Sequence, residues 1–349
     1  MTVGVTGGVT GPRGVTVPRG TAQVFATRLD NPRGLAFGPD GRLYVAEGGK
    51  GGTTSTVGQC TQVPDVGPYT GGFTARISSV DRAGHRRTVV DGLPSSQTNP
   101  GTGSFVSGVA DVTFLRGKLY ALTAGAGCSH GLAGTHNAVL RIDGHHAVEV
   151  ADLSAFQMAN PVARPNPGDF EPDGTWYSMV AAHGNLFAVE PNHGELDRIT
   201  PAGQVDRVVD VSAHLGHVVP TALATRGGRF ILSNLGLFPI QPGTQFLATA
   251  DRHGDFNVVR TGLTAVLGLA FNCEGDLFAL ETSTAAGLPA PGGGQIVEVT
   301  KNEVRTIASG LTFPTAMTFG PDGALYVSDF GFGFPPGAGQ ILRITLHDK

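Results

Sequence analysis

Short apolar runs alternate with tight polar turns along the whole chain, and one such unit occurs twice in nearly the same form. Near the N-terminus, the apolar run 35–37 is followed by a Gly-Pro-Asp-Gly turn and a second apolar run, 43–46. Near the C-terminus, runs 317–319 and 325–328 flank the same turn. Proline fixes φ in such a turn and glycine accepts positive φ, so each unit predicts a β-hairpin, with unbroken apolar runs typical of strands buried on both faces. Two copies near opposite ends of a chain indicate an internal repeat.

Weaker copies fill the interval between these two hairpins. The second strand has a signature in which an aromatic residue precedes a small or branched apolar residue. It recurs at 43–45, 119–121, 186–188, 229–231, 277–279 and 325–327. A second pair of alternating strands follows each hairpin, for example 75–80 with 87–90, 139–142 with 147–150, and 295–300 with 303–307. Four strands in each of six repeats predict an all-β protein, a six-bladed β-propeller with four antiparallel strands per blade.

The two ends of the chain complement each other in this scheme. The last repeat ends at 340–346 with only three strands, whereas residues 23–27 have the pattern of an outermost strand. We predict that this N-terminal strand completes the last blade, which closes the ring and removes an open sheet edge. Residues 21–349 then form a single propeller domain, and the Gly/Val/Thr-rich residues 1–20 a flexible N-terminal segment.

The long irregular segments all fall on one side of such a propeller, called the long-loop face below. This face carries the loops between strands two and three and the connections between blades. The long segments are 48–74, 95–107, 124–137, 154–175, 236–244, 283–294 and 330–339. The opposite face has only tight turns. Because long ordered loops at one end of a rigid scaffold usually carry function, we expect the binding site on the long-loop face.

Composition excludes several classes of partner. The chain of 349 residues has a net charge of −4 and no cluster of lysine or arginine, which argues against nucleic acid. No run approaches the roughly 20 apolar residues of a membrane helix, so we expect no membrane insertion. A hydrophobic content of 40% excludes a disordered chain. We expect a monomer that binds a small-molecule substrate or ligand.

The three cysteines are divided between the two faces. Cys60 and Cys128 lie in corresponding loops of adjacent blades, whereas Cys273 lies in a turn on the opposite face. We predict a Cys60–Cys128 disulfide, with Cys273 free; the alternative is three unrelated thiols. A disulfide implies an oxidising compartment.

Six residues occupy equivalent positions where the second strand of each blade ends at the long-loop face. They are Glu47, Thr123, Glu190, Asn234, Glu281 and Asp329. We expect the carboxylates among them to converge on the axis, where they would raise one another's pKa or attract a cation such as calcium. The alternative is structural: an acid at this point in related propellers often only hydrogen-bonds the following loop.

Other candidates on the same face are histidines and aromatic residues. His193 and His214 belong to long-loop-face segments and are candidates for catalysis, although a histidine among loops is more often structural. Candidate substrate-binding residues are Trp176, Tyr177, Arg33, Asn234 and Phe332. The aromatic side chains could roof an apolar cavity above the carboxylates, or the long loops could simply pack on one another.

Several of these segments resemble the ScyD/ScyE family of bacterial proteins. The resemblance is carried by residues 31–49, the Cys60 loop at 58–74, residues 75–93 and residues 313–344. It implies a six-bladed propeller of the NHL type and an exported protein, secreted or periplasmic, whose export signal is absent from this chain. It implies no settled activity.

Two more distant resemblances bear on chemistry. Residues 277–282 are similar to the strand end of strictosidine-synthase-like propellers, where a glutamate acts as acid/base; Glu281 has that place here. Gluconolactonase-type propellers hold a metal with a glutamate at the start of the first strand, and here Arg33 has roughly that place, which disfavours the same metal site.

These observations lead to three hypotheses of function. The first is an enzyme that performs acid/base chemistry on an aromatic or cyclic metabolite, with Glu281 as acid/base and Glu47, Asp329, Glu190, His193 or His214 beside it. The second is a non-catalytic propeller that binds a ligand or protein. The third is a metal-dependent lactonase or lyase. We expect no organic cofactor, and a divalent metal such as calcium stays open.

Overall fold

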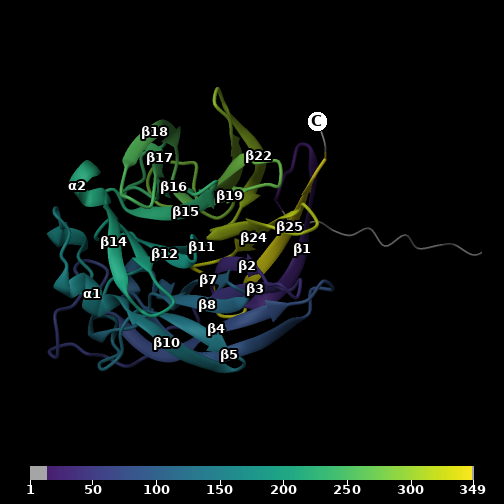
Figure 1. Cartoon of the computed structure of the whole chain (residues 1–349). Coiled ribbons are helices and arrows are strands. Elements are labelled where there is room, and N and C mark those ends of the chain that lie inside the picture. Colours follow the sequence, from purple (N-terminus) through teal and green to yellow (C-terminus); the bar gives the residue numbers. More distant parts are fainter. Residues whose placement is uncertain (1–13, 348–349) are drawn as a thin grey trace, which may run out of the picture.

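The structure is a computed structural model that describes residues 14–347. Within this range the strands form six antiparallel sheets arranged radially about one axis, as Figure 1 shows. The predicted all-β, six-bladed propeller is therefore confirmed. Residues 1–13 of the segment predicted to be flexible lie outside the described residues.

The first three blades follow one another along the chain. Blade one consists of β2 (Pro32–Phe37), β3 (Leu43–Glu47), β4 (Thr70–Val80), β5 (Arg86–Gln97) and the short β6 (Val106–Ser107). Blade two consists of β7 (Val109–Leu115), β8 (Lys118–Thr123), β9 (Ala138–Asp143) and β10 (His146–Asp152). Blade three consists of β11 (Ser178–Ala182), β12 (Asn185–Glu190), β13 (Glu195–Ile199) and β14 (Val205–Asp210).

The remaining blades have the same order of strands. Blade four consists of β15 (Pro220–Arg226), β16 (Arg229–Asn234), β17 (Gln245–Ala250) and β18 (Phe256–Leu263). Blade five consists of β19 (Val266–Phe271), β20 (Leu277–Glu281), β21 (Gly294–Val299) and β22 (Val304–Leu311). Blade six consists of β23 (Ala316–Phe319), β24 (Leu325–Asp329), β25 (Gly339–Leu346) and β1 (Gly20–Leu29).

Short helices lie in the loops between these strands. The α-helices are α1 (Leu153–Ala159) and α2 (Val211–Leu215), and the 3-10 turns are η1 (Pro100–Thr102), η2 (Cys128–His130) and η3 (Pro167–Asp169). Among the described residues, no helix has the length and apolar character needed to cross a membrane.

The ring closes by pairing the two ends of the chain, as predicted. The N-terminal β1 runs antiparallel to the C-terminal β25, with Gly20 opposite Leu346 and Leu29 opposite Gly339. Figure 1 shows purple β1 beside yellow β25. Just before β1, Thr16 exchanges two backbone hydrogen bonds with Ser309 of blade five. The pairing covers the edge of β25 that would otherwise be unpaired, so the last blade has four strands and the ring is closed.

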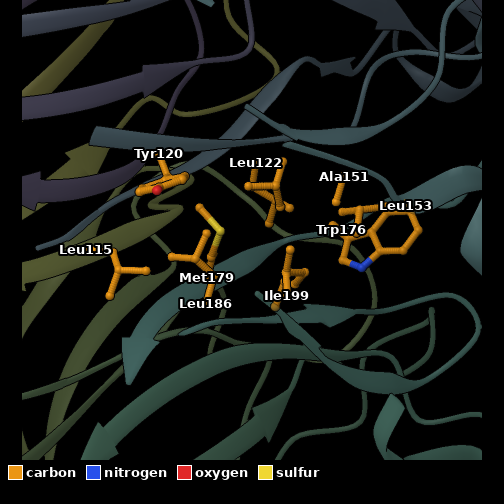
Figure 2. Packing of buried hydrophobic residues seen from close by; sticks show 11 residues of the cluster. Leu115, Tyr120, Leu122, Ala151, Leu153, Trp176, Met179, Leu186 and Ile199 are labelled. Atoms are coloured by element: carbon orange, nitrogen blue, oxygen red, sulfur yellow. The ribbon is translucent and has the colours of Figure 1, made fainter. Parts of the chain in front are cut away.

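The hydrophobic core is divided into clusters that lie between neighbouring blades. Figure 2 shows the cluster between blades two and three, in which Leu122, Leu153, Leu186, Ile199 and Trp176 are fully buried. These residues come from the second strands β8 and β12, from β13 and from the connection that enters blade three. Burying a side chain of this size stabilises a fold by about 1.5–3 kcal/mol, so each cluster fixes the angle between two adjacent blades.

Blade one differs from the prediction because its outer strands are longer. Strands were expected at 75–80 and 87–90, with loops at 48–74 and 95–107. Instead β4 and β5 continue past the blade as a two-stranded ribbon, in which Gly71 pairs with Ser96. Register shifts around Ala75 separate this ribbon from the blade, so the added pairing projects into the long-loop face.

The predicted disulfide is confirmed. It joins Cys60 in the blade-one loop to Cys128 at the start of η2 in the blade-two loop, across 68 residues of sequence, and Cys273 is free and exposed. The bond therefore links the long loops of two adjacent blades to each other.

Removing this disulfide should destabilise the protein without preventing folding of the propeller. For the double variant Cys60→Ser, Cys128→Ser we expect the free energy of unfolding to fall by about 2–5 kcal/mol, because a loop of this length loses its closure constraint in the unfolded chain. Urea denaturation followed by tryptophan fluorescence would measure the change. Cys273→Ser is the matched control and should unfold like the parent; an equal loss in both variants would contradict the assignment.

Candidate functional site

The residues at the ends of the second strands hold the connections between blades. All six are between 0 and 4% exposed. In four blades the carboxylate accepts a hydrogen bond from the backbone N–H of the connection that leads into the same blade. These bonds run from Asp30 N to Glu47 Oε2 (2.6 Å), Thr175 N to Glu190 Oε1 (2.9 Å), Thr264 N to Glu281 Oε1 (2.7 Å) and Thr312 N to Asp329 Oδ1 (2.8 Å).

Blades two and four have uncharged residues at this position. Asn234 donates from Nδ2 to the carbonyl of Val218 at 2.7 Å, so its amide takes the place of the carboxylate. Thr123 bonds instead to the backbone of Ala138 in the neighbouring strand. Five of the six residues therefore hold the connection that enters their own blade, and Thr123 does not.

The carboxylates do not converge on the axis. Their other oxygen atoms are bound within their own blades, as Glu281 Oε2 is by Gln295 and Asp329 Oδ2 is by Gln340. No hydrogen bond joins any two of the six in the described part of the chain. The expected convergence fails because the second strand is not innermost, so its last side chain turns towards the adjacent connection. The catalytic roles given to these residues stay predictions.

Burial nevertheless changes the acidity of these groups. Desolvation raises the pKa of Glu190 to about 7 and that of Asp329 to about 6, although backbone N–H groups partly offset the effect. The pKa of Glu281 is also raised by desolvation. The carboxylate of Glu47 also accepts hydrogen bonds from Arg76, at 2.6 Å, and from Ser78.

The two predicted histidines lie away from the axis. His193 is buried, stacks on Phe170 with ring centroids 4.8 Å apart, and hydrogen-bonds the carbonyl of Glu171. Its pKa is lowered by desolvation. His214 is exposed on α2, with its ring 5.1 Å from Phe256 of β18, the outermost strand of blade four. Neither lies among the residues that line the axial channel described next.

Trp176 was expected at the mouth but belongs to the core. Its indole packs beside Leu153 between blades two and three, as Figure 2 shows, and its Nε1–H donates to Asp197 at 3.3 Å. The connection into blade three directs this side chain into the core between the blades. The next residue, Tyr177, faces the axis.

A channel of about 480 Å³ runs along the axis. Its wall is made by the innermost strands of all six blades, β2, β7, β11, β15, β19 and β23. The ionisable side chains that line it are the carboxyl of Asp111 and the phenol of Tyr177. Asp111 borders the channel, and its depth in the molecule raises its pKa to about 7 by desolvation.

Asp111 bridges three blades. From β7 it accepts the N–H of Val112 at 2.8 Å and, across the blade boundary, the N–H of Met179 in β11 at 2.7 Å. On the other side it lies against Gly34 of β2, where an added β-carbon would come within 1.8 Å of Asp111 Oδ1. The carboxyl is thus held in one orientation by backbone contacts. Sequence reasoning missed it.

Tyr177 crosses the long-loop end of the channel. It enters from blade three, and its hydroxyl donates to the carbonyl of Thr315 in the connection into blade six, on the far side of the ring, at 3.0 Å. Arg33 of blade one hydrogen-bonds the same hydroxyl and also donates to the carbonyl of Val106 at 2.5 Å. Desolvation raises the pKa of Tyr177 to about 12 despite the nearby guanidinium, so the phenol stays protonated.

An aromatic wall adjoins this end of the channel. Phe332 stacks on Phe313 with centroids 4.6 Å apart and meets Phe105 edge-on at 5.7 Å. Phe105 precedes the carbonyl that binds Arg33, and Phe313 lies two residues before Thr315. We call Arg33, Asp111, Tyr177 and this wall the axial site. Of the predicted substrate-binding residues, Arg33 and Tyr177 contact each other, and Phe332 packs against Phe105, the neighbour of Val106. Their role in binding stays a prediction.

The axial site does not fit a metal ion of the kind expected for gluconolactonase-type propellers. Arg33 stands near the start of the first strand of blade one, and its guanidinium would repel a cation. Asp111 supplies one carboxylate whose two oxygens already accept N–H groups. Within residues 14–347 no group of three or more His, Cys, Asp or Glu side chains is placed to hold a metal.

Solved structures share this architecture over nearly the whole chain. A gluconolactonase from Xanthomonas campestris matches with a TM-score of 0.57 and 11% identity, covering 94% of this chain and 90% of that one. The PQQ-bound aldose sugar dehydrogenase from Streptomyces coelicolor matches with a TM-score of 0.56 and 15% identity, covering 97% and 99%. Virginiamycin B lyase from Staphylococcus aureus matches with a TM-score of 0.51 and 13% identity, covering 94% and 100%. At these identities the likeness shows the propeller fold alone.

No protein-family model matches the chain, and no curated protein matches it in sequence. The resemblance to the ScyD/ScyE family therefore stays a prediction.

The raised carboxyl pKa values predict that the protein is less stable at neutral pH than at mildly acidic pH. Between about pH 4 and 7 the unfolded chain has ionised these carboxyls, while the folded chain keeps Asp111 and Glu190 protonated. The folded state then binds more protons, so its free energy of unfolding falls as the pH rises through this range. Urea denaturation at several pH values would measure the slope.

Asp111→Asn should flatten this slope, because the amide does not titrate. The variant should also be less stable at every pH, since the amide keeps only one of the two acceptor oxygens of the carboxyl. Asp143→Asn is the control, because Asp143 is exposed and its pKa is lowered by Arg141. A stability that rises from pH 5 to 7 in the parent protein would contradict the assignment.

Gly34→Ala should disturb the axial site directly. The new β-carbon would lie 2.6 Å from Asp111 Cα as well as close to its carboxylate, so backbone has to move. We expect a loss of about 1–3 kcal/mol in the free energy of unfolding. Gly168→Ala is the control, since its nearest neighbour would be Asn166 Oδ1 at 3.5 Å. Equal stability of the two variants would show that Gly34 and Asp111 are not packed as described.

Proposed function

We propose that the protein is an enzyme that uses acid/base chemistry on a small cyclic or aromatic molecule bound at the axial site. The observation that carries the proposal is Asp111, a carboxyl on the channel wall whose pKa is raised to about 7. A group that titrates near neutrality can both accept and return a proton, which is the requirement for general acid/base catalysis. The fold likeness to a lactonase, a lyase and a dehydrogenase is in keeping with an enzyme.

Each residue of the axial site has a role in this proposal. The Asp111 carboxylate takes a proton from a water molecule or a substrate carbon and later returns it to the leaving oxygen. Arg33 and the hydroxyl of Tyr177 orient the substrate and hold negative charge that develops on its oxygen atoms. Phe332 offers a flat apolar surface to a ring.

Glu281 is the rival acid/base, as the sequence suggested. Its pKa is raised by burial, but both of its oxygens are engaged, one by Thr264 N and the other by Gln295 Nε2. Asp111 also accepts two N–H groups, yet it lines an open channel, whereas Glu281 does not. Access to a substrate therefore favours Asp111.

Two further functions have support of their own. A non-catalytic binding propeller is favoured by the structural contacts of the end-of-strand carboxylates, because these hydrogen bonds already occupy their oxygen atoms. A lactonase or lyase is favoured by the gluconolactonase and virginiamycin B lyase likenesses; its metal-dependent form needs calcium or another divalent ion, for which the axial site lacks ligands.

We further propose that the protein is an exported, monomeric member of the ScyD/ScyE family. The disulfide supports an oxidising compartment, secreted or periplasmic. That family is named after the gene cluster of the pigment scytonemin, so we infer that the small-molecule partner belongs to secondary metabolism.

The proposal can be tested with two cyclic esters, dihydrocoumarin and δ-gluconolactone, as probes. We expect the chelator-treated protein to open the aromatic lactone, with water adding to the carbonyl and the ring oxygen leaving with a proton. Asp111→Asn should slow turnover by about 100-fold or more, because it removes the proton acceptor. Glu281→Gln should change turnover by less than about threefold, and Asp143→Asn not at all.

The other outcomes separate the rivals. Loss of turnover in Glu281→Gln with full activity in Asp111→Asn would assign the role to Glu281. Activity that returns only with added calcium would favour the metal-dependent lactonase. Binding of both probes without turnover would favour the binding propeller and reject the enzyme for this class of substrate.

A further inference from the structure

Arg33 stands near the start of β2, the innermost strand of blade one, and is partly buried. Most partly buried guanidinium groups of the described residues pair with a carboxylate, as Arg76 does with Glu47 and Arg305 with Glu298, whereas Arg260 donates to the carbonyl of Thr300. For Arg33, no Asp or Glu oxygen lies within 4.0 Å among the described residues. Its contacts are the carbonyl of Val106 and the hydroxyl of Tyr177. A guanidinium carries five N–H donors, so part of its capacity is unused.

The surroundings of this guanidinium favour a bound anion. Both of its contacts are to neutral oxygen atoms, which leave its positive charge uncompensated. Tyr177 stays protonated beside it, and its hydroxyl already donates to Thr315. A planar carboxylate can accept two parallel N–H bonds from the fork of an arginine, the strongest form of this contact.

The aromatic wall defines the rest of the ligand. Phe105 is 42% exposed and stands next to the carbonyl that fixes Arg33. Its ring meets Phe332, which stacks on Phe313, two residues before the Thr315 carbonyl that binds Tyr177. The flat apolar surfaces therefore belong to the segments that supply the contacts of Arg33 and Tyr177. A ligand that satisfies both features carries a carboxylate on or near an aromatic ring.

We infer that Arg33 is an anion-binding residue and that the molecule bound at the axial site is an aromatic carboxylate. The inference rests on the proposed function for the location of the site, but it concerns binding and not turnover. In a metal-dependent site a bound metal ion supplies the positive charge, whereas here the guanidinium of Arg33 supplies it.

The test compares 2-naphthoate with 2-naphthamide, which have the same ring and differ in charge. We expect calorimetry at about pH 6 to show that naphthoate binds roughly 10–100-fold more tightly, the range for hydrogen bonds to a charged group. Arg33→Met should remove this preference by weakening naphthoate alone, and Arg33→Lys should keep part of it, because the charge remains and the fork is lost. Arg42→Met is the control; Arg42 lies in the turn after β2, where it pairs with Asp40, and its variant should keep the full preference.

The results separate this inference from the proposed function. Equal binding of the acid and the amide, binding of neither, or an unchanged preference in folded Arg33→Met would overturn the anion site, whatever the lactone assay shows. A clear preference that depends on Arg33, together with full lactone turnover in Asp111→Asn, would leave the anion site in place and remove the catalytic proposal. Thermal unfolding of each variant would show that the propeller is intact.

Discussion

The entrance to the channel depends on one repeated hydrogen bond. At the end of the second strand, a buried carboxylate or amide binds the backbone of the connection that enters the same blade. The bound residues Asp30, Thr175 and Thr312 lie two or three positions before Arg33, Tyr177 and Thr315. Removing such an acceptor would leave a buried N–H without a partner, at a cost of about 1–3 kcal/mol. These contacts therefore fix the backbone that presents the axial site.

This arrangement explains why the acids at the ends of the second strands are buried without forming a metal site within residues 14–347. Each carboxylate serves a different connection, and the blades hold them apart. Their desolvation is compensated locally by backbone N–H groups, so the pKa of Glu190 and of Asp329 rises only to near neutrality. The acids at the ends of the second strands, which the sequence suggested as catalytic residues, bind the connections that lead to the axial site. The residues at the ends of those connections form the surface of the site.

The sequence predicted the fold well because the repeat is carried by strand and turn patterns. Blade number, closure by the N-terminal strand and the Cys60–Cys128 bond all follow from counting equivalent segments. The direction in which a side chain points at the start of an innermost strand cannot be predicted from such counting. In β7 the pairing with β8 shifts register between Val109 and Asp111, so the alternation of inward and outward positions is broken where Asp111 occurs.

A related ambiguity affected the connection into blade three. Trp176 and Tyr177 are adjacent aromatic residues in a loop, and nothing in their spacing tells which one turns inward. The structure assigns Trp176 to the core through Asp197 and Tyr177 to the axis through Thr315. Such assignments depend on contacts between residues far apart in sequence, which a repeat pattern does not contain.

The positive charge of Arg33 affects which ligands the channel attracts electrostatically. A cation fixed at the mouth attracts negative ligands, and Coulomb interactions strengthen where water is excluded. An anion held there would lie near the Asp111 carboxyl and oppose its ionisation, so the pKa of Asp111 would rise further in the complex. The carboxylate form of Asp111, which the proposed proton abstraction needs, would then appear at a higher pH in the complex than in the free channel. Ligand charge and proton position are in this way coupled through one guanidinium.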